Sequence, residues 1–162
     1  MSEQHSGRGF PVVDPANVAP RFGSARYPEA LRAPFAARGK RALGDALGLQ
    51  NFGVNLVHMP AGSESALRHW HTREDEFVMV LEGELTLITN AGETILGPGM
   101  AAGFPAGKAD GHCLVNRSGR DAVYLEVGDR RPGDEVTYPD VDLAAIWRDG
   151  ARRFVHRDGR PY

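Results

Sequence analysis

The stretch that decides the fold runs from Arg68 to Glu84 and reads RHWHTREDEFVMVLEGE. His69 and His71 are two residues apart, and side chains at this spacing point to the same face of a strand. Glu76 follows five residues later and opens the β-rich run Phe77–Leu81. Imidazole nitrogen and carboxylate oxygen suit a divalent first-row metal. The pattern therefore predicts half of a metal site, and the alternative is two solvated loop histidines beside an unrelated glutamate.

A second stretch, from Gly99 to Asn116, supplies a third histidine. It reads GMAAGFPAGKADGHCLVN, with a turn at Pro105 and with His112 four residues before Asn116. Gly and Pro mark such turns, because glycine tolerates unusual dihedrals and proline presets one. A ligand from this stretch has to reach the site from a distant strand.

These two stretches resemble the two motifs of the cupin superfamily. The first motif's positions are filled by Gly62, His69, His71, Glu76 and Gly83, with one extra residue between the first two. The second motif's positions are filled by Gly99, Pro105, Gly107, His112 and Asn116. The resemblance covers residues 51–127, about half of the chain, and the joint pattern is more specific than either motif alone.

The second motif departs from the family pattern at its histidine. That histidine usually comes three positions after the last glycine of PAG, where this chain has Asp110. His112 comes two residues later but keeps the usual spacing to Asn116. We therefore interpret residues 108–110 as part of a longer turn and His112 as the ligand, with Asp110 as the rival ligand.

The resemblance implies an all-β fold, a small antiparallel jelly-roll barrel with a metal inside one mouth. The implied ligands are His69, His71, Glu76 and His112. Such a set leaves a six-coordinate metal with two open positions for water, dioxygen or a chelating substrate. The same ligands can serve iron, manganese, nickel, zinc or copper, so the sequence does not name the cofactor.

Function is less constrained than fold, because the family includes dioxygenases, isomerases and decarboxylases. We expect a metal-dependent oxygenase or isomerase that acts on a small oxygenated metabolite, although the sequence leaves catalysis itself open. The alternative is a non-catalytic module that binds a sugar or organic acid. A structural barrel with a vestigial metal site is disfavoured by the intact ligand set.

Outside the motifs, the chain favours extensions of one domain. Residues 1–50 are rich in proline and predict an irregular N-terminal arm that packs on the barrel, with residues 51–127 as the barrel core and 128–162 as a C-terminal extension. Glu84–Asn90 alternates in polarity and leads into an Asn-Ala-Gly turn, which predicts a β-hairpin. Val141–Trp147 is expected to be a short helix. An exposed sheet edge, together with the frequent dimerisation of cupins, favours a homodimer.

Composition excludes several classes of function. The chain has 162 residues and a net charge of −2, which gives no basic footprint for nucleic acid or a membrane surface. Its 20 glycines and 11 prolines suit a turn-rich β protein. The N-terminus lacks the apolar region of a secretory signal, and the single cysteine allows no internal disulfide, so we expect a cytoplasmic protein.

Four further residues could belong to a functional site, but we expect each of them to lie outside it. His58 is expected on a strand outside the site, and His156 on the surface. Cys113 should face away from the side of His112 as a small buried apolar residue. Trp70, between the two ligand histidines, should face away from the metal as a packing anchor or dimer contact.

Overall fold

The computed structural model describes residues 12–24 and 26–162, so the first eleven residues of the expected arm lie outside the described part. The largest sheet has six antiparallel strands in the order β1-β2-β3-β10-β5-β8. Their bounds are Arg21–Phe22, Gly39–Ala42, Phe52–Met59, Ala122–Asp129, Glu76–Glu82 and Ala101–Phe104. The segment expected to be an irregular arm thus contributes two strands to this sheet.

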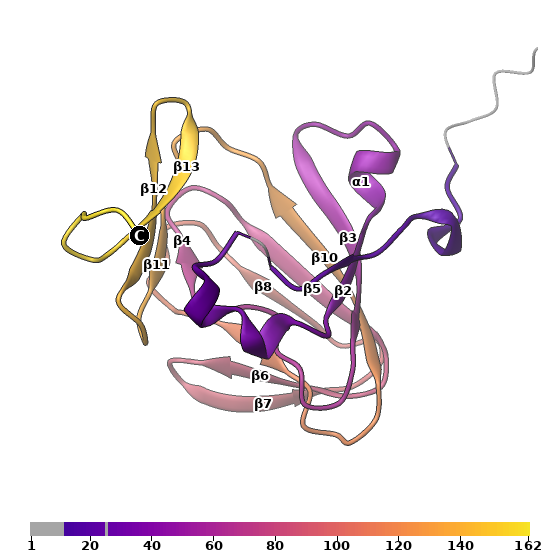
Figure 1. The fold of residues 1–162 in the computed structure, drawn as a ribbon. Coiled ribbons are helices and arrows are strands. Elements are labelled where there is room, and N and C mark those ends of the chain that lie inside the picture. Colours follow the sequence, from indigo (N-terminus) through magenta and orange to yellow (C-terminus); the bar gives the residue numbers. More distant parts are fainter. Residues whose placement is uncertain (1–11, 25) are drawn as a thin grey trace, which may run out of the picture.

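A three-stranded sheet, in the order β7-β6-β9, lies below the large sheet in Figure 1. It comprises β6 (Leu85–Thr89), β7 (Gly92–Leu96) and β9 (Cys113–Val115). The hairpin predicted from the alternating run is confirmed, since β6 and β7 pair with Thr89 opposite Gly92. Apolar side chains from both sheets form one core, which includes Val57, Val80, Leu85, Leu114 and Tyr124.

A four-stranded sheet in the order β13-β12-β11-β4 flanks the other two. Its strands are β4 (Trp70–His71), β11 (Val136–Tyr138), β12 (Leu143–Arg148) and β13 (Ala151–Val155). Residues 141–147 therefore do not form the expected helix. Leu143 and Ala145 are buried and alternate with half-buried neighbours, and Asp149-Gly150, both at positive φ, turns β12 back into β13. Two successive positive φ values are the geometry of a tight hairpin turn.

The N-terminal segment lies across the sheets, as the indigo ribbon in Figure 1 shows. It carries three single-turn 3-10 helices, η1 (Pro15–Asn17), η2 (Glu29–Leu31) and η3 (Ala33–Phe35), and α1 spans Leu43–Ala46. Tyr27 and Phe35 from this segment share a second core with residues of the C-terminal strands, among them Tyr138 and Leu143. The N-terminal segment and the C-terminal strands therefore share a core, and β11 of those strands pairs with β4, which carries His71.

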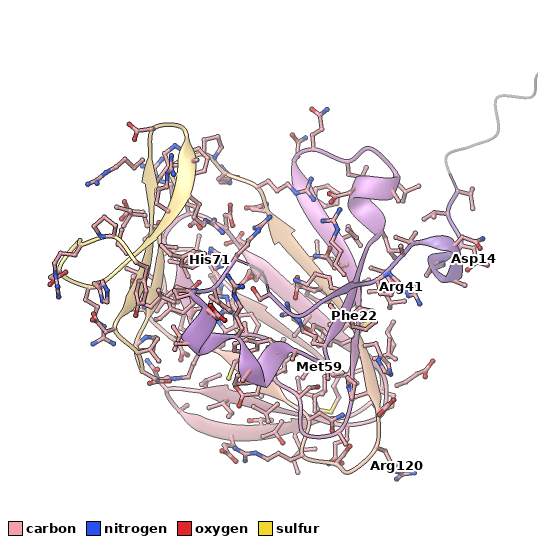
Figure 2. The ribbon with its side chains drawn as sticks, in the orientation of Figure 1. Asp14, Phe22, Arg41, Met59, His71 and Arg120 are labelled. Atoms are coloured by element: carbon pink, nitrogen blue, oxygen red, sulfur yellow. The ribbon has the colours of Figure 1, made fainter. Side chains whose placement is uncertain are left out.

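The all-β antiparallel class expected from the sequence is confirmed. Figure 2 places His71 on the side of the C-terminal strands and Asp14 at the far end of the N-terminal segment. Within the described residues, none of the helices is long and apolar enough to span a membrane.

Candidate metal centre

Backbone pairing places His112 of the second motif next to His69 of the first motif. His69 N donates to His112 O over 3.1 Å, and His112 N donates to His69 O over 2.9 Å. Residues paired directly across an antiparallel bridge place their side chains on the same face. His69 and His112 therefore share a face, and their ring centroids are 4.9 Å apart. The backbone register therefore places His112 beside His69, whereas the Asp110 carboxylate accepts the Asn90 backbone N–H.

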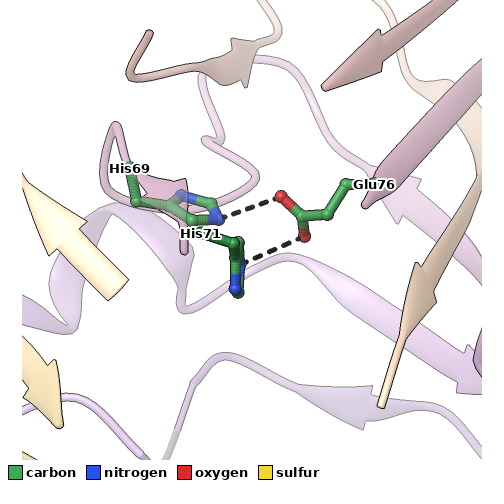
Figure 3. A group of neighbouring side chains, drawn as sticks. All are labelled: His69, His71 and Glu76. Atoms are coloured by element: carbon green, nitrogen blue, oxygen red, sulfur yellow. Dashed lines mark ion pairs between the residues drawn. The ribbon is translucent and has the colours of Figure 1, made fainter. Parts of the chain in front are cut away.

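Glu76, the first residue of β5, points its carboxylate into the histidine group. Its Oε2 lies 2.8 Å from His112 Nε2 and 3.5 Å from His69 Nε2. Its Oε1 lies 3.6 Å from His71 Nε2. Figure 3 shows His69 and His71 facing the two oxygens of this one carboxylate. One donor atom each from His69, His71 and Glu76 lie within 4.8 Å of one another, and His112 joins this group through Glu76.

The protonation of the site follows from burial and mutual contact. Burial alone would raise the pKa of Glu76, but hydrogen bonds from His112 and His69 outweigh it and hold that pKa well below its usual range. Burial alone would lower the pKa of His69, yet the Glu76 carboxylate raises it above its usual value. For His112, burial dominates and lowers the pKa. An ionised carboxylate and a neutral His112 are the states in which these groups bind metals.

The residues present fit a divalent cation. His69 Nδ1 lies 2.7 Å from the Leu67 carbonyl oxygen, and His71 Nδ1 lies 2.6 Å from a carboxylate oxygen of Asp134. Both partners are acceptors, so each Nδ1 donates a hydrogen bond and each ring presents Nε2 to the Glu76 carboxylate. Two imidazole Nε2 atoms that lie 3.5 and 3.6 Å from the oxygens of one carboxylate form a nitrogen and oxygen donor set. Such a set suits a divalent transition metal.

A cavity of about 170 Å³ opens beside the donors. At about 30 Å³ per water molecule, this is room for five or six waters or a small metabolite. Leu87 and Phe104 form part of its apolar wall, and Phe104 stacks on His112 with ring centroids 3.5 Å apart. Trp70, which we expected to face away from the metal, lines this cavity, as do Lys108 and Asp110.

The remaining sequence candidates lie outside the donor group. Asp110 Oδ1 accepts the backbone N–H of Asn90 over 2.8 Å. His58 is exposed and its Nε2 lies 2.9 Å from Asp121 Oδ2, as expected for a strand histidine away from the site. His156 pairs with Asp142 in the C-terminal loop. Cys113 is buried, and burial raises the pKa of its thiol to about 11, so it behaves as a small apolar residue.

Sequence reasoning missed the polar residues behind His71. Asp134, Glu74 and Arg152 surround its Nδ1 side. Two of these come from the C-terminal extension, for which the motifs define no spacing. The one available signal was weak: Asp134 is an acidic residue in a Pro-Gly turn just ahead of a strand.

Comparisons with protein-family models and with solved structures found proteins that are similar to this chain. A family model described as "Cupin domain" matches residues 55–128. A sugar phosphate isomerase of the cupin superfamily from Silicibacter pomeroyi is 43% identical, with a TM-score of 0.89 over 94% of this chain and 96% of that one. A protein from Acidithiobacillus ferrooxidans, provisionally named a sugar phosphate isomerase, is 30% identical, with a TM-score of 0.75 over 86% of each chain.

More distant structures share the fold alone. The polyketide cyclase RemF from Streptomyces resistomycificus is 20% identical, with a TM-score of 0.60 over 80% of this chain and 85% of that one. A search of curated proteins found no match.

Proposed function

The chain belongs to the cupin superfamily, and from that premise we propose that it is a metal-dependent isomerase of sugar phosphates. The observation that carries the proposal is the 43% identity, over nearly the whole of both chains, to a protein named a sugar phosphate isomerase. In this proposal His69, His71, Glu76 and His112 hold a divalent transition metal. The fold alone could not select this activity, because the same fold hosts unrelated chemistries.

Aldose–ketose isomerisation needs a proton carrier and no net redox change. A proton leaves the carbon that bears a hydroxyl and a proton is added to the neighbouring carbonyl carbon, while the hydroxyl proton moves to the other oxygen. A bound divalent cation would polarise those two oxygens. The chain itself has to supply the group that takes and returns the proton within hydrogen-bond reach of the substrate.

Asp110 is the carboxylate that suits proton transfer. Glu74 also lines the cavity, but its two oxygens accept from the Arg131 backbone N–H over 3.0 Å and from Arg152 over 3.2 Å. Among the described residues, only one oxygen of Asp110 is engaged, by the Asn90 N–H. We therefore assign the proton-carrier role to Asp110, which the sequence also offered as the rival metal ligand.

Lys108 suits the phosphate end of the substrate. Of the described residues that line the cavity, Lys108 is the one with a cationic side chain, and it lies exposed in the turn after Pro105. An ammonium binds phosphate as a point charge. Leu87 and Phe104 then face the carbon chain, and the metal site lies beyond them.

The test follows deuterium from the solvent. Protein loaded with Mn²⁺, Fe²⁺ or Zn²⁺ is incubated in D₂O with a panel of aldose and ketose phosphates, and proton NMR records interconversion and deuterium at the carbon next to the carbonyl. We expect both, and we expect Asp110→Asn to lose them while keeping its metal. Sugar phosphate that binds without exchanging protons would instead favour the non-catalytic binding module.

The phosphate contact has its own control. Lys108→Ala should raise KM for a phosphorylated sugar with little change in kcat, because the lysine binds a group that does not react. Arg120 does not line the cavity and lies well away from His71 in Figure 2, so Arg120→Ala removes an exposed cation outside the site and should leave KM unchanged.

A further inference from the structure

Asp134 contacts His71 on the ring nitrogen opposite the one that faces Glu76. The Asp134 side chain is fully buried, in the loop between β10 and β11 and beyond the region matched to the cupin family. Its Oδ2 lies 2.6 Å from His71 Nδ1, and its Oδ1 accepts the backbone N–H of Arg73 over 2.9 Å. The imidazole is thus held from behind by a carboxylate that is itself fixed to the backbone.

Arg152 on β13 completes this cluster. Its Nη2 lies 2.7 Å from Asp134 Oδ2 and 3.2 Å from Glu74 Oε2, and that same Glu74 oxygen is 3.4 Å from His71 Nδ1. His71, Glu74 and Asp134 lie close enough together to hold a metal of their own. The Arg152 guanidinium, however, already places a cation against both carboxylates. The cluster is therefore a support for His71 and not a second metal site.

The donors around Asp134 fix the proton on His71. The backbone N–H of Arg73 and the guanidinium of Arg152 both donate to this carboxylate, which as an ionised group can only accept. His71 must therefore donate from Nδ1, which leaves the lone pair on Nε2. Hydrogen bonding at one ring nitrogen is how proteins select the nitrogen that binds a metal.

We propose that Asp134, clamped by Arg152, is a positioning residue that holds His71 as the Nδ1-protonated tautomer with Nε2 aimed at the metal. This inference rests on the proposed metal centre and extends it beyond the residues of the two motifs. The C-terminal strands then belong to the site, because β11 fixes His71 through backbone pairing and β13 carries Arg152. Loss of the β12–β13 hairpin would remove Arg152 and so loosen His71, although His71 itself would remain.

Asp134→Asn is the informative substitution because it replaces one accepting oxygen with a donating amide. Whichever way the amide turns, its NH₂ faces a donor, either the Arg73 N–H or the pair formed by His71 and Arg152. Outer-shell partners of ligating histidines are typically worth about 10–100-fold in metal affinity. We expect a loss of about this size for Zn²⁺, measured by competition with a chromophoric chelator.

Asp142→Asn is a matched control outside the site. Asp142 faces His156 Nδ1 over 2.8 Å and accepts the Arg157 backbone N–H over 2.9 Å, which repeats the Asp134 pattern on a histidine outside the donor group. Zn²⁺ affinity should be unchanged in this variant. Asp134→Asn protein that folds and binds Zn²⁺ as tightly as the wild type overturns the proposal.

A second readout needs no variant, in case Asp134→Asn fails to fold. Long-range proton–nitrogen NMR of the wild-type protein, metal-free at a pH where the ring is neutral and then loaded with Zn²⁺, reports the protonated nitrogen of His71. Protonated Nδ1 in both states is expected, and protonated Nε2 in the metal-free protein overturns the proposal. If the wild type binds no Zn²⁺, the metal centre fails, and the metal-free spectrum still tests the role of Asp134 separately.

Discussion

Replacing His112 with alanine should abolish tight metal binding, whereas replacing Asp110 should not. His112 lies opposite His69 in an antiparallel bridge, is 7% exposed, and places Nε2 2.8 Å from Glu76. Its removal deletes one of four proposed ligands and the ring that stacks on Phe104. If loss of an outer-shell partner costs up to ~100-fold in affinity, loss of a direct ligand should cost at least ~100-fold, about 2.7 kcal/mol.

The Asp110 substitution has a different expected cost. Its carboxylate accepts the Asn90 N–H in a loop, so Asp110→Ala loses one peripheral hydrogen bond, worth about 1 kcal/mol of stability. Zn²⁺ affinity should change by less than about threefold, well below the cost of even an outer-shell partner. Proton exchange into the sugar phosphate should nevertheless fall, because the proposed carrier is gone.

The assay is a Zn²⁺ competition titration of both variants beside the wild type and His58→Ala. His58 is an exposed histidine on β3 that pairs with Asp121, so it controls for the loss of an imidazole that does not bind the metal. Circular dichroism before titration shows that each variant is folded. Loss of metal in Asp110→Ala together with retention in His112→Ala would refute the assignment of the second motif.

Three further expectations concern packing, titration and assembly. Gly83 and Gly62 both have positive φ, but a Cβ on Gly83 would lie 2.6 Å from the Asp121 carbonyl oxygen, whereas a Cβ on Gly62 would meet open space. Gly62→Ala should lower the free energy of unfolding in urea by about 1 kcal/mol, and Gly83→Ala by about 2–4 kcal/mol. Equal losses would contradict the close approach at Gly83. Burial raises the pKa of Cys113 to about 11, so the stability that the protonated thiol contributes is lost as pH rises from the unfolded value of about 8.5 towards 11. At pH 8, iodoacetamide should modify Cys113 far more slowly in the folded protein than in urea, and equal rates would rule out the burial argument. Sedimentation equilibrium at micromolar concentration should give a homodimer, and a monomer would count against it.

The grouping of His69, His71 and Glu76 could be predicted from the sequence because their spacing is local. Strand parity places His69 and His71 on one face, and Glu76 follows within a single turn. His112 was harder, since its pairing with His69 spans more than forty residues, and only its spacing to Asn116 favoured it over Asp110. The structure adds the backbone bridge, which is a tertiary feature without a local signature.

The C-terminal segment shows where local reasoning failed. An aspartate near its start, Asp140 or Asp142, favoured a helix over Val141–Trp147. In the structure, Leu143 and Ala145 are instead buried on one face of a strand and alternate with half-buried neighbours. Asp149-Gly150 was the overlooked hairpin signal. Asp134 and Arg152 could not be assigned to the site by any spacing rule, because only the folding of the hairpin against β4 brings them to His71.

The metal content of protein purified without chelators tests the account most directly. Elemental analysis of the wild type should find close to one divalent transition metal per chain, and Glu76→Gln, which removes the carboxylate shared by three imidazoles, should lose it. Dialysed wild-type protein should recover one equivalent on titration with Mn²⁺, Fe²⁺ or Zn²⁺. A wild-type chain that is purified without metal and binds none of these three ions would contradict the account.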